Sequence, residues 1–163
     1  MRTINLALRW FFASTVVLLH IHSKAHAHHA FAAEFDANSP VKLVGQVIKV
    51  EWINPHAWIH IEINDNKSDI GKSRKNNELE ASQVWMIEGG TPNTLIRAGI
   101  NKNTIQPGTE VIVRGFQAKD KRCRPACKAN GRDITLMNGE KLFMGSSGTG
   151  APRDGSDPRE PKR

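Results

Sequence analysis

The chain has 163 residues, of which 39% are hydrophobic, and a formal net charge of +7. This length fits one globular domain with a modest core and requires no second domain. Neither the composition nor the charge indicates a membrane-embedded or strongly polyanion-binding class.

Residues 1–27 have the pattern of a secretory signal peptide. Arg2 and Arg9 supply a basic start without acids, and an apolar run over residues 10–19 follows. That run is shorter than the roughly 20 residues that a membrane-spanning helix needs. Cleavage after Ala25 or after Ala27 satisfies the small-x-small rule, and we favour the second. We therefore expect a periplasmic or secreted protein with no membrane span after cleavage.

The mature chain is only mildly basic. Removal of residues 1–27 takes away three cations and no acid, so the formal charge falls from +7 to +4. A solvated surface is the ordinary interpretation of such a charge, and binding of anionic lipid, polysaccharide or an acidic protein is the alternative. We expect no nucleic-acid partner in this compartment.

Strand signals begin the folded part. Residues 41–52 are rich in β-branched side chains and contain Gly45, where we expect the strand to bend or bulge. After a turn at Asn54-Pro55, residues 57–63 alternate strictly, which predicts a strand with its aliphatic face toward the core. Residues 64–81 are polar and predict an exposed loop.

A third strand and a short helix follow. Residues 83–88 read as the strand, which ends at a pair of glycines. Thr91 then suits the N-cap of a helix, Pro92 its first position and Gly99 the C′ position. Leu95 supplies part of the apolar stripe of this helix, together with Ile96.

The last strands surround an Asn-Gly turn. Residues 110–116 predict the fourth strand, and the fifth is split into 132–137 and 140–143 across Asn138-Gly139, the strongest signal for a type I′ hairpin. Residues 145–163 predict a disordered tail. The order of elements over residues 28–144 is that of a mainly β, five-stranded OB-like Greek-key barrel with one short helix between strands 3 and 4. An open sheet with a helix on one face is the alternative.

Cys123 and Cys127 are the only cysteines, and both lie in a loop-like segment. In an oxidising compartment such a close pair predicts a local disulfide. Its ring is small, so it would restrain a turn rather than hold the fold together. A thiolate pair for a soft metal is the alternative.

Several segments resemble a family of small exported bacterial proteins known as a domain of unknown function. The likeness rests on the sequences His-His-Ala-Phe at 28–31, Trp-Ile-Asn-Pro-His-Ala-Trp at 52–58 and Gly-Thr-Pro-Asn at 90–93. It implies a signal peptide, a mature start at His28 and an OB-like barrel, and it implies no established activity. The loop at 64–81, the two cysteines and the charged tail depart from it.

The histidines predict a metal site. All seven lie between residues 20 and 29 or at 56 and 60. Cleavage after Ala27 would give His28 a free α-amine beside its imidazole, a pair that suits copper, nickel or zinc. We expect the N-terminal segment to fold back so that His28, with His29, meets His56 or His60, of which we favour His56, with copper as the candidate ion. His56 capping a turn and His60 lying on the solvent face form the alternative interpretation.

A second hypothesis uses no metal. Trp52, Trp58 and His60 would form a barrel face that binds a periplasmic protein or a small ligand. We expect no enzyme and name no catalytic residue, since the chain has no nucleophile with a nearby base, no phosphate loop and no closed ligand set.

Overall fold

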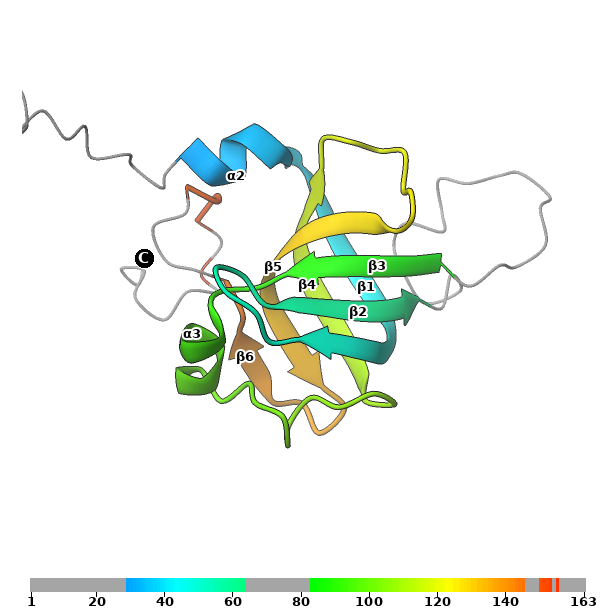
Figure 1. The fold of residues 1–163 in the computed structure, drawn as a ribbon, viewed down its shortest axis with the longest axis vertical. Helices are drawn as coiled ribbons and strands as arrows, with labels where there is room; N and C mark the ends of the chain where they lie inside the picture. Colours follow the sequence, from blue (N-terminus) through cyan, green and yellow to red (C-terminus); the bar gives the residue numbers. More distant parts are fainter. Residues whose placement is uncertain (1–28, 64–82, 146–149, 154, 156–163) are drawn as a thin grey trace, which may run out of the picture.

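The computed structural model describes residues 29–63, 83–145, 150–153 and 155. The predicted signal peptide at 1–27, His28, the loop at 64–81 and most of the tail lie outside these residues. The described part contains six strands and two short helices (Figure 1): α2 (His29–Glu34), β1 (Phe35–Glu51), β2 (Trp58–Ile63), β3 (Gln83–Glu88), α3 (Pro92–Arg97), β4 (Glu110–Ala118), β5 (Cys127–Leu136) and β6 (Lys141–Phe143).

The six strands form one sheet in the order β3-β2-β1-β4-β5-β6. These neighbours pair antiparallel, and β3 also pairs with β5 in parallel. The pairings therefore run from β1 through β2, β3, β5 and β4 back to β1, which gives a ring of strands. The mainly β prediction is confirmed, whereas the structure has six strands rather than five and a second helix, α2, which was not predicted. The OB-fold assignment stays a prediction.

β1 is the longest strand, and its pairings are irregular at two places, of which the first lies between Phe35 and Pro40 opposite β4. Its register against β2 shifts between Val47 and Lys49, so the bulge is not at Gly45. Gly45 has another role, because a Cβ atom there would collide with the backbone oxygen of Glu62. The glycine thus permits a close approach of two backbones.

The alternation predicted over β2 is confirmed by burial. Ala57, Ile59 and Ile61 are fully buried and Ile63 is nearly so. Since successive side chains of a strand point to opposite faces, Trp58, His60 and Glu62 lie on the outer face. The inner face packs into a core that also includes Leu43, Val47, Trp85, Ile87, Leu95, Ile100, Val111, Val113, Ile134 and Met144.

The short helix α3 begins and ends as predicted. The Thr91 hydroxyl accepts a hydrogen bond from the Thr94 amide at 3.2 Å, and Pro92 is the first helical residue. At the other end Gly99 has a φ of 88°, and the Ile100 amide donates to Leu95 O at 2.9 Å. This is a Schellman closure, which favours glycine at C′ because the residue there is left-handed. Ile96, by contrast, is 55% exposed, so the predicted apolar stripe is buried only at Leu95.

The hairpin between β5 and β6 forms around Asn138-Gly139 with a different turn from the predicted one. A type I′ turn needs positive φ at both central residues. Gly139 has a φ of 86°, but Cys123 is the only non-glycine residue with positive φ among those described. The turn prediction is therefore wrong. The Leu136 amide donates to Glu140 O at 2.9 Å, which closes a three-residue loop with glycine at its left-handed position.

A small apolar cluster holds α2 against the ring. Phe31 packs edge-on against Phe116 with ring centroids 5.6 Å apart and lies 5.7 Å from Phe35. Ala118 completes the buried group, and Ala151 packs on it. A six-residue helix is too short to be stable alone. Its position therefore depends on these contacts, which explains why its own sequence did not predict it.

Candidate functional site

His56 lies in the segment before β2, beside the end of β3. Two backbone hydrogen bonds fix this segment: the Ala57 amide donates to Gly90 O at 3.0 Å and the Gly89 amide donates to Ala57 O at 2.8 Å. The ring atom Nδ1 of His56 consequently lies 3.3 Å from Gly89 O and 3.8 Å from Glu88 Oε1. The side chain is 32% exposed, so the imidazole is held on one side and remains accessible.

Glu88 occupies a row of outward-facing residues that crosses three strands. It is paired with Trp58 on β2 and with Asn130 on β5. Residues directly opposite each other on neighbouring strands have Cβ atoms about 4.5–5.5 Å apart. The Asn130 side chain donates from Nδ2 to Glu88 Oε1 at 3.3 Å. The Glu88 side chain is only 12% exposed, although it is on the outer face.

The environment of Glu88 changes its acidity. Burial raises the pKa of this carboxyl above its ordinary value, and the negative charge of Glu34 acts in the same direction. His56, Asn130 and Lys128 oppose the shift by favouring the carboxylate. The Oδ1 atom of Asn130 is buried without a hydrogen-bond partner among the described residues. A buried carboxylate, an amide and an imidazole thus meet at one end of β3.

Sequence analysis missed Glu88 and Asn130. Glu88 reads as an outward-facing strand residue, since it alternates with Trp85 and Ile87 on the core face. Its surroundings include Asn130 on β5, with which it is paired and hydrogen-bonded and which lies far away in the sequence. The one local signal is a glutamate directly before Gly89-Gly90, where the strand ends.

The three residues predicted as metal ligands are described to different extents. His28 lies outside the described residues. His29 is the first residue of α2, and only its backbone is described. His56 is described and has the contacts given above. The far end of α2 lies close to this site, because Glu34 Oε1 is 3.5 Å from Lys128 Nζ. Within the described ranges, no three side chains of His, Cys, Asp or Glu gather in a way that could hold a metal ion.

The alternative ligand-binding residues lie on or near the outer face of β2. Trp58 is partly exposed, and the ammonium of Lys128 lies 5.6 Å from its ring centroid. His60 is 14% exposed with Nε2 at 3.6 Å from Glu51 Oε2. Trp52 packs against the core instead. The three residues therefore do not form one open aromatic platform.

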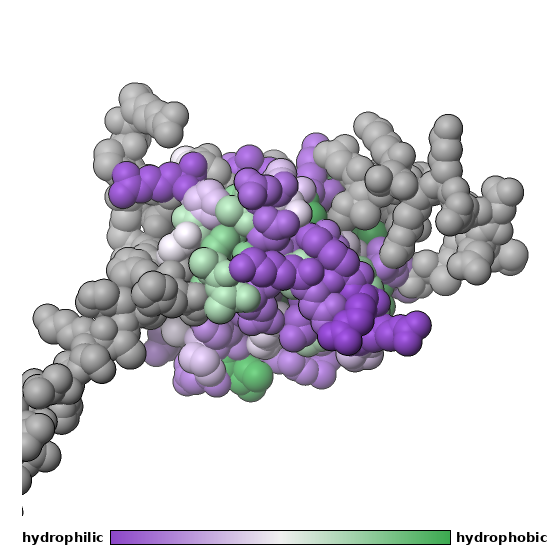
Figure 2. Space-filling model, turned by 90° about the horizontal axis from the view of Figure 1, so that it is seen from above, coloured by the Kyte–Doolittle hydropathy of each residue, from purple (hydrophilic) through white to green (hydrophobic). Residues whose placement is uncertain are grey.

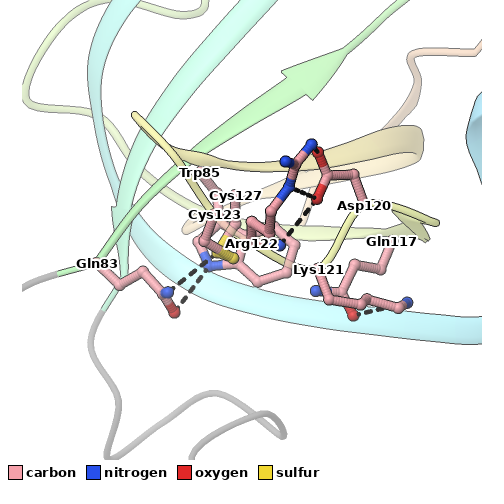
Figure 3. The surroundings of a disulfide bond; sticks show 8 residues. All are labelled: Gln83, Trp85, Gln117, Asp120, Lys121, Arg122, Cys123 and Cys127. Atoms are coloured by element: carbon pink, nitrogen blue, oxygen red, sulfur yellow. Dashed lines mark hydrogen bonds and ion pairs between the residues drawn. A yellow bond between two sulfur atoms is a disulfide. The ribbon is translucent and has the colours of Figure 1, made fainter.

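Cys123 and Cys127 form the predicted disulfide (Figure 3). No free thiol is left among the described cysteines, so a thiolate metal site at this pair is excluded in the oxidised protein. The prediction that both cysteines lie in a loop is wrong for Cys127. This residue is the first of β5 and is paired with Trp85. The disulfide thus attaches an exposed segment to the ring of strands.

The comparisons with known proteins place the chain in a family. A model of a family of unknown function, DUF6152, matches residues 16–125. This range is more than half of the chain, so the protein belongs to that family. No curated protein and no solved structure matches it. None of the helices described here has the length and apolarity that a membrane span requires.

Proposed function

We propose that this protein is a small exported binding protein with an OB-like barrel, and that it binds a transition metal ion, copper, through His28, His29 and His56. The signal-peptide pattern supports export. The closed circuit of strand pairings, with a helix between β3 and β4, supports the OB-like assignment. The metal proposal rests chiefly on the surroundings of His56.

The observation that carries the metal proposal is the contact pattern of Nδ1 of His56. Histidines that ligate a metal usually donate the other ring N–H to a carboxylate or a backbone carbonyl, which fixes the tautomer and the ring orientation. Nδ1 of His56 is within hydrogen-bond distance of one such partner, Gly89 O at 3.3 Å, and the Glu88 carboxyl lies next to it, with Oε1 at 3.8 Å. With a proton on Nδ1, Nε2 is the basic nitrogen that would bind the ion.

The donor chemistry favours copper in its oxidised state. A mature start at His28 would offer an α-amine and an imidazole from one residue, and His29 adds a second ring or a backbone amide. Nitrogen donors of this kind suit Cu(II) more than they suit Mg²⁺ or Ca²⁺. The two cysteines are bonded to each other and supply no thiolate. The carboxyl of Glu88 lies beside the proposed site, with Oε1 3.8 Å from Nδ1 of His56.

The test is a Cu(II) titration of the mature protein with its N-terminus at His28. The proposal predicts tighter binding than that of the free peptide His-His-Ala-Phe, and weaker binding in His56→Ala. His60→Ala is the matched control, because His60 is the other described histidine of this region but lies within β2 and contacts Glu51 instead. Equal affinity of the wild type and His56→Ala, or affinity no better than that of the peptide, would overturn the proposal.

Export has a separate test. Expression of the full chain in a bacterial host should give a processed protein outside the cytoplasm, and mass spectrometry should find His28 as its first residue. A start at His26 would keep a copper-competent terminus with histidine in the third position. Recovery of unprocessed chain from the cytoplasm would contradict export.

A second candidate function is an interaction module without metal. Trp58 supports it, since this side chain is partly exposed on the outer face with a cation beside its ring. Trp58→Ala would then abolish capture of the partner, whereas a metal-binding protein would keep its copper affinity in this variant.

A further inference from the structure

The Cys123–Cys127 disulfide has an environment that suits chemical exchange. We infer that it is an exchange site for an external dithiol, in which Cys123 Sγ is attacked and Cys127 Sγ is the leaving group. This exchange site shares no residue with the proposed metal site and is independent of it. It is supported by exposure, by one hydrogen bond and by the charge of the surrounding segment (Figure 3).

The two sulfur atoms differ in accessibility. Cys127 is 1% exposed and belongs to the core, opposite Trp85 on β3. Cys123 is only partly buried and lies in a segment whose neighbours Arg122 and Arg124 are exposed. An incoming thiolate therefore reaches the sulfur of Cys123 first. Access is one of the factors that determine which sulfur is attacked.

The leaving sulfur has a hydrogen-bond donor in place. Gln83 donates from Nε2 to Cys127 Sγ at 3.0 Å, and its Oε1 accepts from Trp85 Nε1 at 3.4 Å. Burial alone would disfavour a thiolate at Cys127, whereas a hydrogen bond to the charged form favours it. The Trp85 contact orients the Gln83 amide so that its NH₂ group faces the sulfur.

The segment around the disulfide is cationic. Residues 119–128 contain five basic side chains and one acid. That acid, Asp120, is engaged by Arg122, which lies 2.7 Å away, and this ion pair holds the pKa of Asp120 well below its usual range. Positive charge near a cysteine lowers the pKa of its thiol and attracts an incoming thiolate. Figure 2, which looks at the molecule from above, shows a largely hydrophilic face.

Opening of the bond should leave the fold intact. The ring that the disulfide closes spans only five residues, so the bond restrains little of the entropy of the unfolded chain. Cys127 stays in place through its strand pairing with Trp85, and the change would be confined to residues 119–126. The protein can therefore pass between oxidised and reduced forms without unfolding.

The exchange consists of two successive thiol–disulfide reactions. A thiolate of the dithiol attacks Cys123 Sγ, the S–S bond breaks, and its electron pair goes to Cys127 Sγ, which takes up a proton. The second thiolate of the external dithiol then attacks the sulfur of the same dithiol that is bonded to Cys123. This S–S bond breaks, and its electron pair goes to Cys123 Sγ, which takes up the second proton. The dithiol is oxidised to a disulfide, and the cysteine pair gains two electrons and two protons.

The first test locates the attacked sulfur. The folded mature protein is treated with reduced glutathione as a monothiol probe, free thiols are alkylated, and peptides are analysed by mass spectrometry. We expect glutathione on Cys123 and the alkyl group on Cys127. Glutathione on Cys127, or no reaction until the protein is denatured, would overturn the inference.

The second test measures the contribution of Gln83. Dithiothreitol should reduce Gln83→Ala roughly three- to tenfold more slowly than the wild type, as expected for the loss of one hydrogen bond. Gln117→Ala is the matched control, since Gln117 contacts Lys121 rather than the sulfur, and it should react at the wild-type rate. Circular dichroism should not change on reduction. Equal rates for the two variants, or unfolding on reduction, would contradict the inference.

Discussion

Nδ1 of His56 lies 3.8 Å from Oε1 of Glu88, two residues that are 32 positions apart and meet because Ala57 exchanges backbone hydrogen bonds with Gly89 and Gly90. The carboxylate is mostly buried and the imidazole is partly exposed. The pair therefore has a buried inner member, Glu88, and an accessible outer member, His56. In metal sites, a neighbouring carboxylate or carbonyl that holds the non-ligating nitrogen of a histidine fixes the orientation of its ring.

The first prediction concerns the pH dependence of stability. Burial raises the pKa of Glu88 above 4.5 in the folded chain, so the folded state binds this proton more tightly than the unfolded state does. The contribution of Glu88 to stability is then fully present below pH about 4.5 and is lost as the pH rises through the raised pKa. The titratable groups that act on it are His56, Glu34 and Lys128.

Glu88→Gln should remove this loss. The urea midpoint of the wild type should fall relative to that of Glu88→Gln as the pH increases from 4.5 toward neutrality. Glu140→Gln, at an exposed position in the β5–β6 turn, is the control and should run parallel to the wild type. If the urea midpoint of Glu88→Gln had the same pH dependence as that of the wild type, burial would not raise the pKa of Glu88.

The second prediction concerns Asp133, which is 1% exposed and binds Arg114 through two nitrogens, with Nη2 at 2.5 Å and Nε at 2.9 Å from Oδ2. Asp133→Asn should lower the free energy of unfolding by about 1–3 kcal/mol, because a buried charge-assisted contact is lost. Urea denaturation measures this value. Asp120→Asn, which breaks an exposed pair with Arg122, should leave the midpoint unchanged. Equal effects would show that burial does not distinguish the two pairs.

The third prediction concerns Gly45. Gly45→Ala should prevent β1 and β2 from pairing normally, because its Cβ would collide with the backbone oxygen of Glu62. We expect a loss of more than about 3 kcal/mol, above the range of ordinary point substitutions. Gly139→Ala meets no atom within 4 Å and has only its positive φ to overcome, so it should cost about 1–2 kcal/mol. Similar losses in thermal denaturation would contradict the close approach at Gly45.

The features that sequence analysis predicted correctly are local ones. The cap at Thr91, the closure at Gly99 and the alternation over β2 each depend on a few consecutive residues with a defined backbone preference. The disulfide likewise follows from the spacing of Cys123 and Cys127.

The features that it missed depend on contacts between distant segments. The helix α2 is held by Phe116, and β5 begins at Cys127 rather than near residue 132 because its first residues pair with β3. Glu88 accepts a hydrogen bond from Asn130, which lies 42 residues further along the chain. His56 was named as a candidate, but its carboxylate partner could not be found without the register of β2, β3 and β5.

The most direct test of the central claim counts the imidazole nitrogens bound to Cu(II). Pulsed electron paramagnetic resonance of the mature protein, loaded with one equivalent of Cu(II), should detect one imidazole more in the wild type than in His56→Ala. His60→Ala should give the wild-type spectrum. Identical spectra for the wild type and His56→Ala would show that the folded domain supplies no ligand, and would contradict the account of His56 and Glu88 given above.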